Sequence, residues 1–170
     1  MILLSDKTWK SSTGPIRMSN IYDGEMYDAH FEIAGWDTPD YDDSKWSGVI
    51  LSSFPKSVIV ASEGAPVIRI EELKPVKKII TPKKEVVLDF GQNLTGRVKF
   101  TVKGKKGDTL IIHHAEVLDK EGNFYTENLR SAKQQITYVL KMMVKSIMSL
   151  FYISGIQVYS HKRVEQCLRK

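Results

Sequence analysis

Carboxylates are the side chains in this chain best suited to acid–base chemistry. There are six of interest: Asp23, Glu25, Asp28, Asp42, Asp43 and Glu116. A catalytic acid and base must sit at a fixed separation on either side of the reacting bond. No spacing among these six indicates such a pair, so we expect most of them to cap turns or to be solvated.

Two acid-rich loops, residues 37–43 and 119–123, contain the oxygen ligands that calcium prefers. In the first loop, the candidate ligands are Asp40, Asp42 and Asp43. The second loop starts Asp-x-Glu-x-Asn, but it does not have the residue spacing of an EF-hand. Calcium at the first loop is therefore the cofactor that the sequence allows, and we expect no other.

Among the aromatic and nucleophilic residues, only Trp36 stays a candidate for a binding role. Trp36 and Trp46 could each stack on a sugar ring, although large aromatics in β-structure are mostly core, which is what we expect of Trp46. His113 and His114 fall on opposite faces of one expected strand, so they cannot chelate one ion and are better explained as a packed or surface pair. Cys167 has no cysteine partner and no neighbouring base, which argues against catalysis.

The net charge of +5 belongs to the end of the chain. After residue 140 there are six basic residues and one acid, which leaves 19 of each sign in the first 140 residues. A nucleic-acid-binding protein needs a basic stripe on an ordered surface, so we expect no nucleic-acid partner. We expect no membrane partner either, since the apolar run from residue 147 to 159 is shorter than the roughly 20 residues of a spanning helix.

The elements that position these residues are predicted to be strands. Residues 97–103 alternate apolar and polar side chains, which is typical of a strand with one buried face. Residues 86–90, 109–117 and 134–140 are further strands, and Gly104 to Asp108 closes a hairpin. Such strands joined by short turns predict antiparallel β-structure.

Two shorter strands are predicted earlier in the chain, at residues 58–61 and 67–70. Pro66 and Pro75 confine them to sheet edges or strand starts, because proline cannot donate a ladder hydrogen bond. Before them, Asp23-Gly24 is a turn dipeptide, and Ser52 to Pro55 is the best linker.

Several short sequence motifs in this chain resemble those of the bacterial alpha-L-rhamnosidases. They are Asp-Phe-Gly-Gln-Asn at 89–93 with Thr95-Gly96, His-Ala-Glu-Val-Leu-Asp at 114–119 with Gly122, and Asn-Leu-Arg at 128–130. Earlier motifs are Tyr-Asp-Gly-Glu at 22–25, Gly35-Trp36, and Asp-Asp-Ser-x-Trp at 42–46. The family usually has Arg where this chain has His30, which leaves the role of that position in doubt.

The resemblance implies an all-β fold. An antiparallel, concanavalin-like (jelly-roll) β-sandwich would follow the last part of a galactose-binding-like sandwich. Sugar binding would then fall to Trp36, Asp23 and Glu25. The family is taken to be inverting, with its acid and base in a helical barrel downstream, and this chain shows no sequence typical of that barrel.

The expected domains are 1–52, the end of the first sandwich; 53–140, the concanavalin-like sandwich; and 141–170, a tail outside the resemblance. Residues 1 to about 50 would pack onto the second domain or be poorly ordered, because a partial sandwich leaves an open edge. Our hypothesis for the tail is a frameshift near residue 141, since shifted codons permit two family motifs there. One shift cannot yield both motifs, so a second slip is needed or one match is chance.

The function predicted is that of an alpha-L-rhamnosidase fragment, inactive by itself, that binds an L-rhamnose-containing glycan or acts as a scaffold. The alternatives are an enzyme in its own right, a stand-alone rhamnose-binding lectin-like protein, or membrane or nucleic-acid binding by the tail. No signal-peptide hydrophobic region follows Met1, so the compartment stays undetermined, and a bacterial origin is expected.

Overall fold

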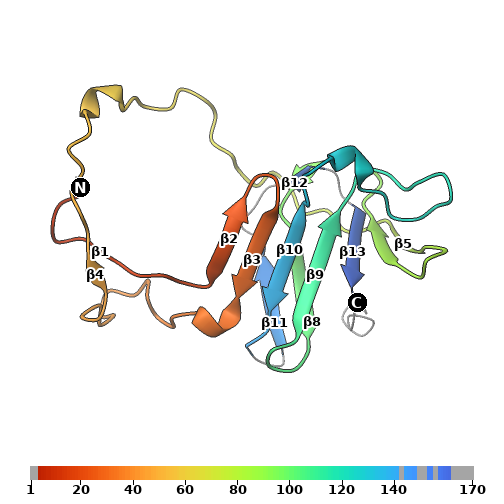
Figure 1. Cartoon of the computed structure of the whole chain (residues 1–170), viewed down its shortest axis with the longest axis horizontal. Coiled ribbons are helices and arrows are strands. Elements are labelled where there is room, and N and C mark those ends of the chain that lie inside the picture. The colour runs from red at the N-terminus through yellow and green to blue at the C-terminus, as the bar shows by residue number, and fades with distance from the viewer. Residues whose placement is uncertain (1–3, 142–143, 149–152, 155–156, 162–170) are drawn as a thin grey trace. The chain divides into compact units, whose positions relative to one another are not determined.

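The computed structural model describes residues 4–141, 144–148, 153–154 and 157–161. The chain forms two compact units that interleave in sequence. Unit 1 contains residues 1–14 and 33–72, and unit 2 contains residues 15–32 and 73–170 (Figure 1).

Unit 1 has little regular structure. Its strands β1 (Lys10–Ser11) and β4 (Ser47–Gly48) pair antiparallel, and one 3₁₀ turn, η2 (Lys56–Val58), follows. No described residue of this unit is buried. The strands predicted at residues 58–61 and 67–70 do not form, so that prediction is wrong. A strand forms only beside another strand that bonds to its backbone. In unit 1 the strands β1 and β4 have two residues each, which is too short to pair with a further strand.

Unit 2 is built on a seven-stranded sheet in the order β2-β3-β10-β9-β13-β6-β5. Those strands are β2 (Ile16–Asn20), β3 (Gly24–Asp28), β5 (Lys77–Ile80), β6 (Val86–Asp89), β9 (Thr109–His114), β10 (Gln135–Val139) and β13 (Gln157–His161). Two small pairs accompany it: β8 (Lys99–Lys103) with β11 (Val144–Met148), and β7 (Thr95–Gly96) with β12 (Ile153–Ser154). The 3₁₀ turns η1 (Ala29–Phe31) and η3 (Glu127–Leu129) lie between strands.

The all-β prediction is confirmed, and four of the predicted strands appear as β6, β8, β9 and β10. The structure adds one parallel pair, in which β3 lies beside β10 with Gly24 opposite Gln135. Strands so far apart in sequence are not constrained by a hairpin turn, so their direction is set by packing. Of the first fifty residues, which we expected to pack onto the second domain or to be poorly ordered, β2 and β3 join the sheet of the later strands, while residues 1–14 and 33–50 belong to unit 1.

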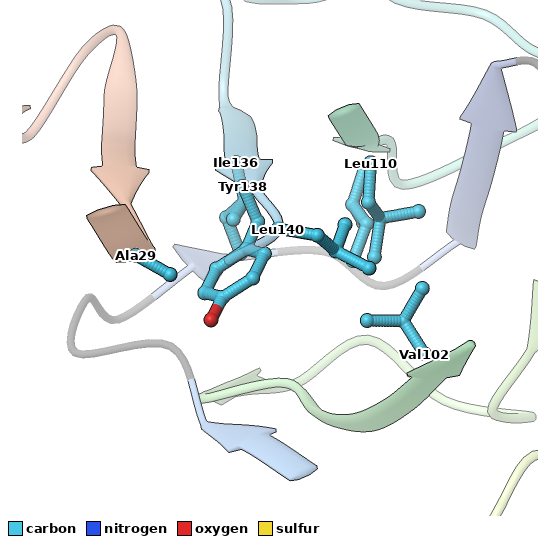
Figure 2. Close-up of a cluster of buried hydrophobic side chains, with 7 residues drawn as sticks. Ala29, Val102, Leu110, Ile136, Tyr138 and Leu140 are labelled. Carbon is cyan, nitrogen blue, oxygen red and sulfur yellow. The ribbon is translucent and has the colours of Figure 1, made fainter. Parts of the chain in front are cut away.

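The core lies between the large sheet and β8 (Figure 2). Its buried apolar residues are Ala29, Val102, Leu110, Ile112, Ile136, Tyr138 and Leu140. Along β9 the buried positions alternate as Leu110, Ile112 and His114, so these three side chains share the face of the strand that is turned to the core. Ile111 and His113 on the other face are half-buried, so this strand is covered in part on both sides.

The chain beyond residue 140 joins this fold. Backbone of β11, β12 and β13 pairs with β8, β7 and both β6 and β9. The frameshift hypothesis is not tested by this pairing and stays a prediction. Cys167 lies outside the described residues. None of the helical turns in the described part of the chain is long and apolar enough to cross a membrane.

Candidate functional site

Asp23 sits in a tight turn between β2 and β3. The Asn20 side-chain oxygen accepts from the backbone N–H of Asp23 at 2.7 Å, and the Asn20 amide donates to the Asp23 carboxylate at 2.9 Å. This amide bond is the main reason that the pKa of Asp23 lies below its usual value. Lys133 approaches the same carboxylate at 3.6 Å. Asp23 therefore presents an ionised, partly exposed carboxylate beside a lysine.

The turn is held against the start of β10 by backbone bonds. Tyr22 O accepts from the N–H groups of Lys133 and Gln134, both at 3.0 Å, and Asp23 O accepts from Gln135 N at 2.9 Å. Tyr22 itself is 68% exposed. An exposed aromatic ring beside a carboxylate is a combination that can contact a sugar.

Glu25, the second predicted sugar-binding acid, occupies a different environment. It lies on β3 opposite Ile136 and is 3% exposed. Its charge contributes to raising the pKa of Tyr27, after burial and Tyr138. This burial favours a structural role within the sheet, and its part in sugar binding stays a prediction.

Trp36 belongs to unit 1 and projects from a short turn. Gly35 adopts a φ of +72°, and its carbonyl accepts from both the backbone N–H of Thr38 at 3.0 Å and the Thr38 hydroxyl at 2.7 Å. The indole is 60% exposed. Trp46, by contrast, is half-buried against Tyr41, with ring centroids 5.6 Å apart. Of these two tryptophans, Trp36 has the ring free to stack on a ligand.

The predicted calcium ligands are engaged in local contacts. Asp42 accepts from Ser44 N at 3.0 Å, the largest cause of its lowered pKa. The Asp43 carboxylate pairs with Lys10 at 2.6 Å, and this pair links the loop to β1. Asp40 is exposed. Among the described residues, no group of three or more His, Cys, Asp or Glu side chains is placed to hold a metal ion. Calcium binding here stays a prediction, and it would require the Lys10–Asp43 pair to open.

A buried polar contact that the sequence did not reveal centres on His114. Its Nδ1 lies 2.8 Å from Gln134 O, which also accepts from the backbone N–H of His114 at 3.2 Å. Nε2 has no hydrogen-bond partner among the described residues. Burial lowers the pKa of His114 to about 4, against a small opposing effect of the Gln134 bond. The histidine is therefore neutral at physiological pH and holds Gln134, whose φ is +46°.

The prediction for the two histidines is confirmed, since His114 is buried in the sheet while His113 is half-buried on the other face. His30, at the position where the family usually has Arg, lies with Nδ1 2.8 Å from the Asp28 carboxylate. The backbone bond from His30 is the largest cause of the lowered pKa of Asp28. Asp28 at the end of β3, two residues before His30, is the sequence signal by which this capped turn could have been found.

Comparison with known proteins identifies the family. Residues 79–157 match the bacterial alpha-L-rhamnosidase concanavalin-like domain, and residues 1–71 match the alpha-L-rhamnosidase N-terminal domain. The chain belongs to the bacterial alpha-L-rhamnosidase family. The concanavalin-like match runs to residue 157, past residue 140, where we expected the resemblance to stop.

Curated relatives agree with this. An alpha-L-rhamnosidase of Streptomyces avermitilis is 40% identical over 142 residues, covering 82% of this chain and 14% of its own length. One from Formosa agariphila is 38% identical over 138 residues, covering 81% of this chain and 15% of its own length. The chain thus spans about a seventh of these alpha-L-rhamnosidases.

Solved structures show the same fold. The alpha-L-rhamnosidase of Aspergillus terreus superposes with a TM-score of 0.84 at 39% identity, covering 93% of this chain and 18% of that one. The Streptomyces avermitilis alpha-L-rhamnosidase complexed with L-rhamnose gives 0.82 at 37% identity, covering 92% and 16%. These matches support the concanavalin-like, all-β architecture of this family member.

Proposed function

We propose that this chain is a non-catalytic part of an alpha-L-rhamnosidase that recognises L-rhamnose-containing glycans and supports the fold of that enzyme. The observation that supports this most is its likeness, over 92% of its length, to an alpha-L-rhamnosidase complexed with L-rhamnose. The parent reaction would be hydrolysis of terminal alpha-L-rhamnose.

Trp36 is the residue on which we place recognition. Its exposed indole lies on a turn closed by the two bonds from Thr38 to Gly35 O, and it offers a flat apolar face to a sugar ring. The exposed acids Asp40 and Asp42 and the half-buried Asp43 follow within seven residues, and they could contact hydroxyl groups directly or through calcium.

Calorimetric titration of the purified chain with L-rhamnose, with and without calcium, tests the proposal. We expect saturable binding, lost in Trp36→Ala and retained in Trp9→Ala. Trp9 is a matched control because it is also an exposed tryptophan of unit 1, at 51% against 60% for Trp36. No heat in either titration would leave only scaffolding, and equal loss in both variants would remove Trp36 from the site.

Turnover is the separate test of the non-catalytic role. The purified chain is expected to release no product from a chromogenic alpha-L-rhamnoside. Sustained release, retained through a further purification step, would contradict that role and make the chain an enzyme in its own right.

A further inference from the structure

Residues 15–32 belong to one domain by sequence and to another by structure. The match to the N-terminal domain covers residues 1–71, and the match to the concanavalin-like domain begins only at residue 79. Yet residues 15–32 form β2, β3 and η1 of unit 2, while the residues on both sides of them belong to unit 1. The sheet of unit 2 is therefore assembled from two separate stretches of chain, and we call residues 15–32 the hairpin segment.

The turn of the hairpin segment is bonded to the chain at the start of β10. Tyr22 O and Asp23 O accept from the backbone N–H groups of residues 133–135 at 2.9–3.0 Å. From the same place, the side-chain amide of Gln134 donates to Ile21 O at 3.0 Å. These contacts lie within unit 2, and they fix the turn at one position along β10.

The strand that follows this turn contributes side chains to the core. β3 lies parallel to β10 over residues 24–28, and Tyr27 stacks on Tyr138 with ring centroids 5.2 Å apart and planes 9° apart. Glu25 is 3% exposed and Ala29 is fully buried. Ala29 belongs to the same buried cluster as Tyr138 (Figure 2). The hairpin segment is thus part of the packed interior of unit 2.

The sheet order shows what the hairpin segment covers. β3 lies between β2 and β10, so without the segment β10 would be an edge strand. Its backbone would lack a neighbour on that side, and its core residues Ile136 and Tyr138 would lose their cover. An edge of this kind accepts an added strand, with main-chain bonds supplying affinity and side chains supplying specificity.

We propose that the edge of β10 is a docking surface that binds the hairpin segment without needing a covalent connection to it. The partner it fits is a two-stranded hairpin with glycine at the start of its second strand and an aromatic residue three positions later. Glycine is required because a Cβ at Gly24 would collide with the backbone of Gln135. The aromatic residue, here Tyr27, is required to stack on Tyr138. Residues matched to the N-terminal domain thereby complete the concanavalin-like sheet.

An engineered break in the chain tests whether the contact holds without covalent continuity. No helix or strand lies between η2 and β5 in the described chain, so a protease recognition sequence inserted after Gly64 interrupts none. Complete cleavage of the full-length chain leaves the hairpin segment on one piece and β10 on the other. We expect the pieces to stay together in size-exclusion chromatography and to keep the far-UV circular dichroism of the uncut chain. Pieces that separate, or a sheet lost on cleavage, would overturn the proposal.

A pair of neighbouring variants tests whether β3 is what holds the pieces together. In the cleaved chain, Tyr27→Ala should weaken the association roughly tenfold or more, because it removes the stack on Tyr138. Met26→Ala is the matched control, since Met26 lies on the other face of β3 and is 38% exposed. Sedimentation velocity on dilution measures both. Equal association in the two variants would place the contact elsewhere and contradict the docking surface.

A variant on the β10 side tests the same surface without removing a core side chain. Gln134→Asn shortens the amide that donates to Ile21 O, and asparagine tolerates the φ of +46° at residue 134. We expect a smaller loss of association than in Tyr27→Ala, with the circular dichroism of the uncut variant unchanged. If the pieces of both variants associate as tightly as those of the parent, with the sheet intact, the proposal is wrong.

Discussion

At the residue scale, buried polar side chains fix the position of the backbone around them. His114 shows this best, because both its backbone N–H and its ring bond to Gln134 O. Gln134 in turn donates from its backbone to Tyr22 O and from its side chain to Ile21 O. One buried histidine thus secures the junction between β10 and the turn that carries Asp23.

This contact predicts a pH dependence of stability. The folded-state pKa of His114 is about 4, below the 6.5 of an unperturbed histidine, so the unfolded chain binds the proton more readily. Stability from this group is full above pH 6.5 and is lost as the pH falls toward 4. The shift corresponds to about 3 kcal/mol between neutral pH and pH 4.

Urea unfolding between pH 7 and pH 4 measures this effect. His114→Asn keeps a donor for Gln134 O but does not titrate, so its stability should fall much less over the same range. His113→Asn is the matched control, and it should retain the slope of the parent. A slope that is unchanged in His114→Asn would assign the acid sensitivity to other groups.

At the scale of elements, the parallel contact of β3 with β10 depends on one glycine. A Cβ added at Gly24 would collide with the backbone oxygen of Gln135, and the φ of Gly24 is +101°. Only glycine combines that backbone conformation with so close an approach. The β2–β3 hairpin can therefore join the sheet only with this residue at its tip.

Gly24→Ala is expected to destabilise unit 2 by about 3 kcal/mol or more, since both strain and a backbone clash must be relieved. Gly107→Ala isolates the strain alone, because Gly107 has a φ of +84° with nothing within 4 Å of the added Cβ. It should cost about 1–2 kcal/mol. Urea unfolding followed by circular dichroism compares the two, and equal losses would show that the clash is avoided.

For the whole molecule, the division into units separates the core from the tryptophans. All three tryptophans, Trp9, Trp36 and Trp46, are in unit 1, where no described residue is buried. The buried aromatic packing is in unit 2, where Tyr27 stacks on Tyr138 at 5.2 Å.

Unfolding by two probes should therefore not coincide. We expect Trp9 and Trp36 to emit as solvent-exposed tryptophans already in the native state, so that urea changes the emission mainly through the half-buried Trp46. Far-UV circular dichroism should report a cooperative transition of the unit 2 sheet. Superimposable curves with a large emission change would contradict independent units and indicate one cooperative body.

Local pattern in the sequence was sufficient for much of unit 2. Alternation along residues 97–103 and the apolar run at 109–117 identified β8 and β9, because strand periodicity is a property of neighbouring residues. The motifs at 89–93 and 114–119 indicated the family, which the domain matches confirm. The turn at Asp23-Gly24 was also predictable, since that dipeptide favours it.

Tertiary structure decided what depends on partners distant in the chain. The parallel pairing of β3 with β10 and the bond from His114 to Gln134 each join segments at least 20 residues apart. The burial of Glu25 follows from the first of these contacts, which removes its carboxylate from water. The strands expected at 58–61 and 67–70 failed for the same reason, because propensity without a neighbouring strand does not form a ladder. The sequence by itself thus determined the strands, the turns and the family, and the contacts between distant segments determined which strands pair and which side chains remain free to bind.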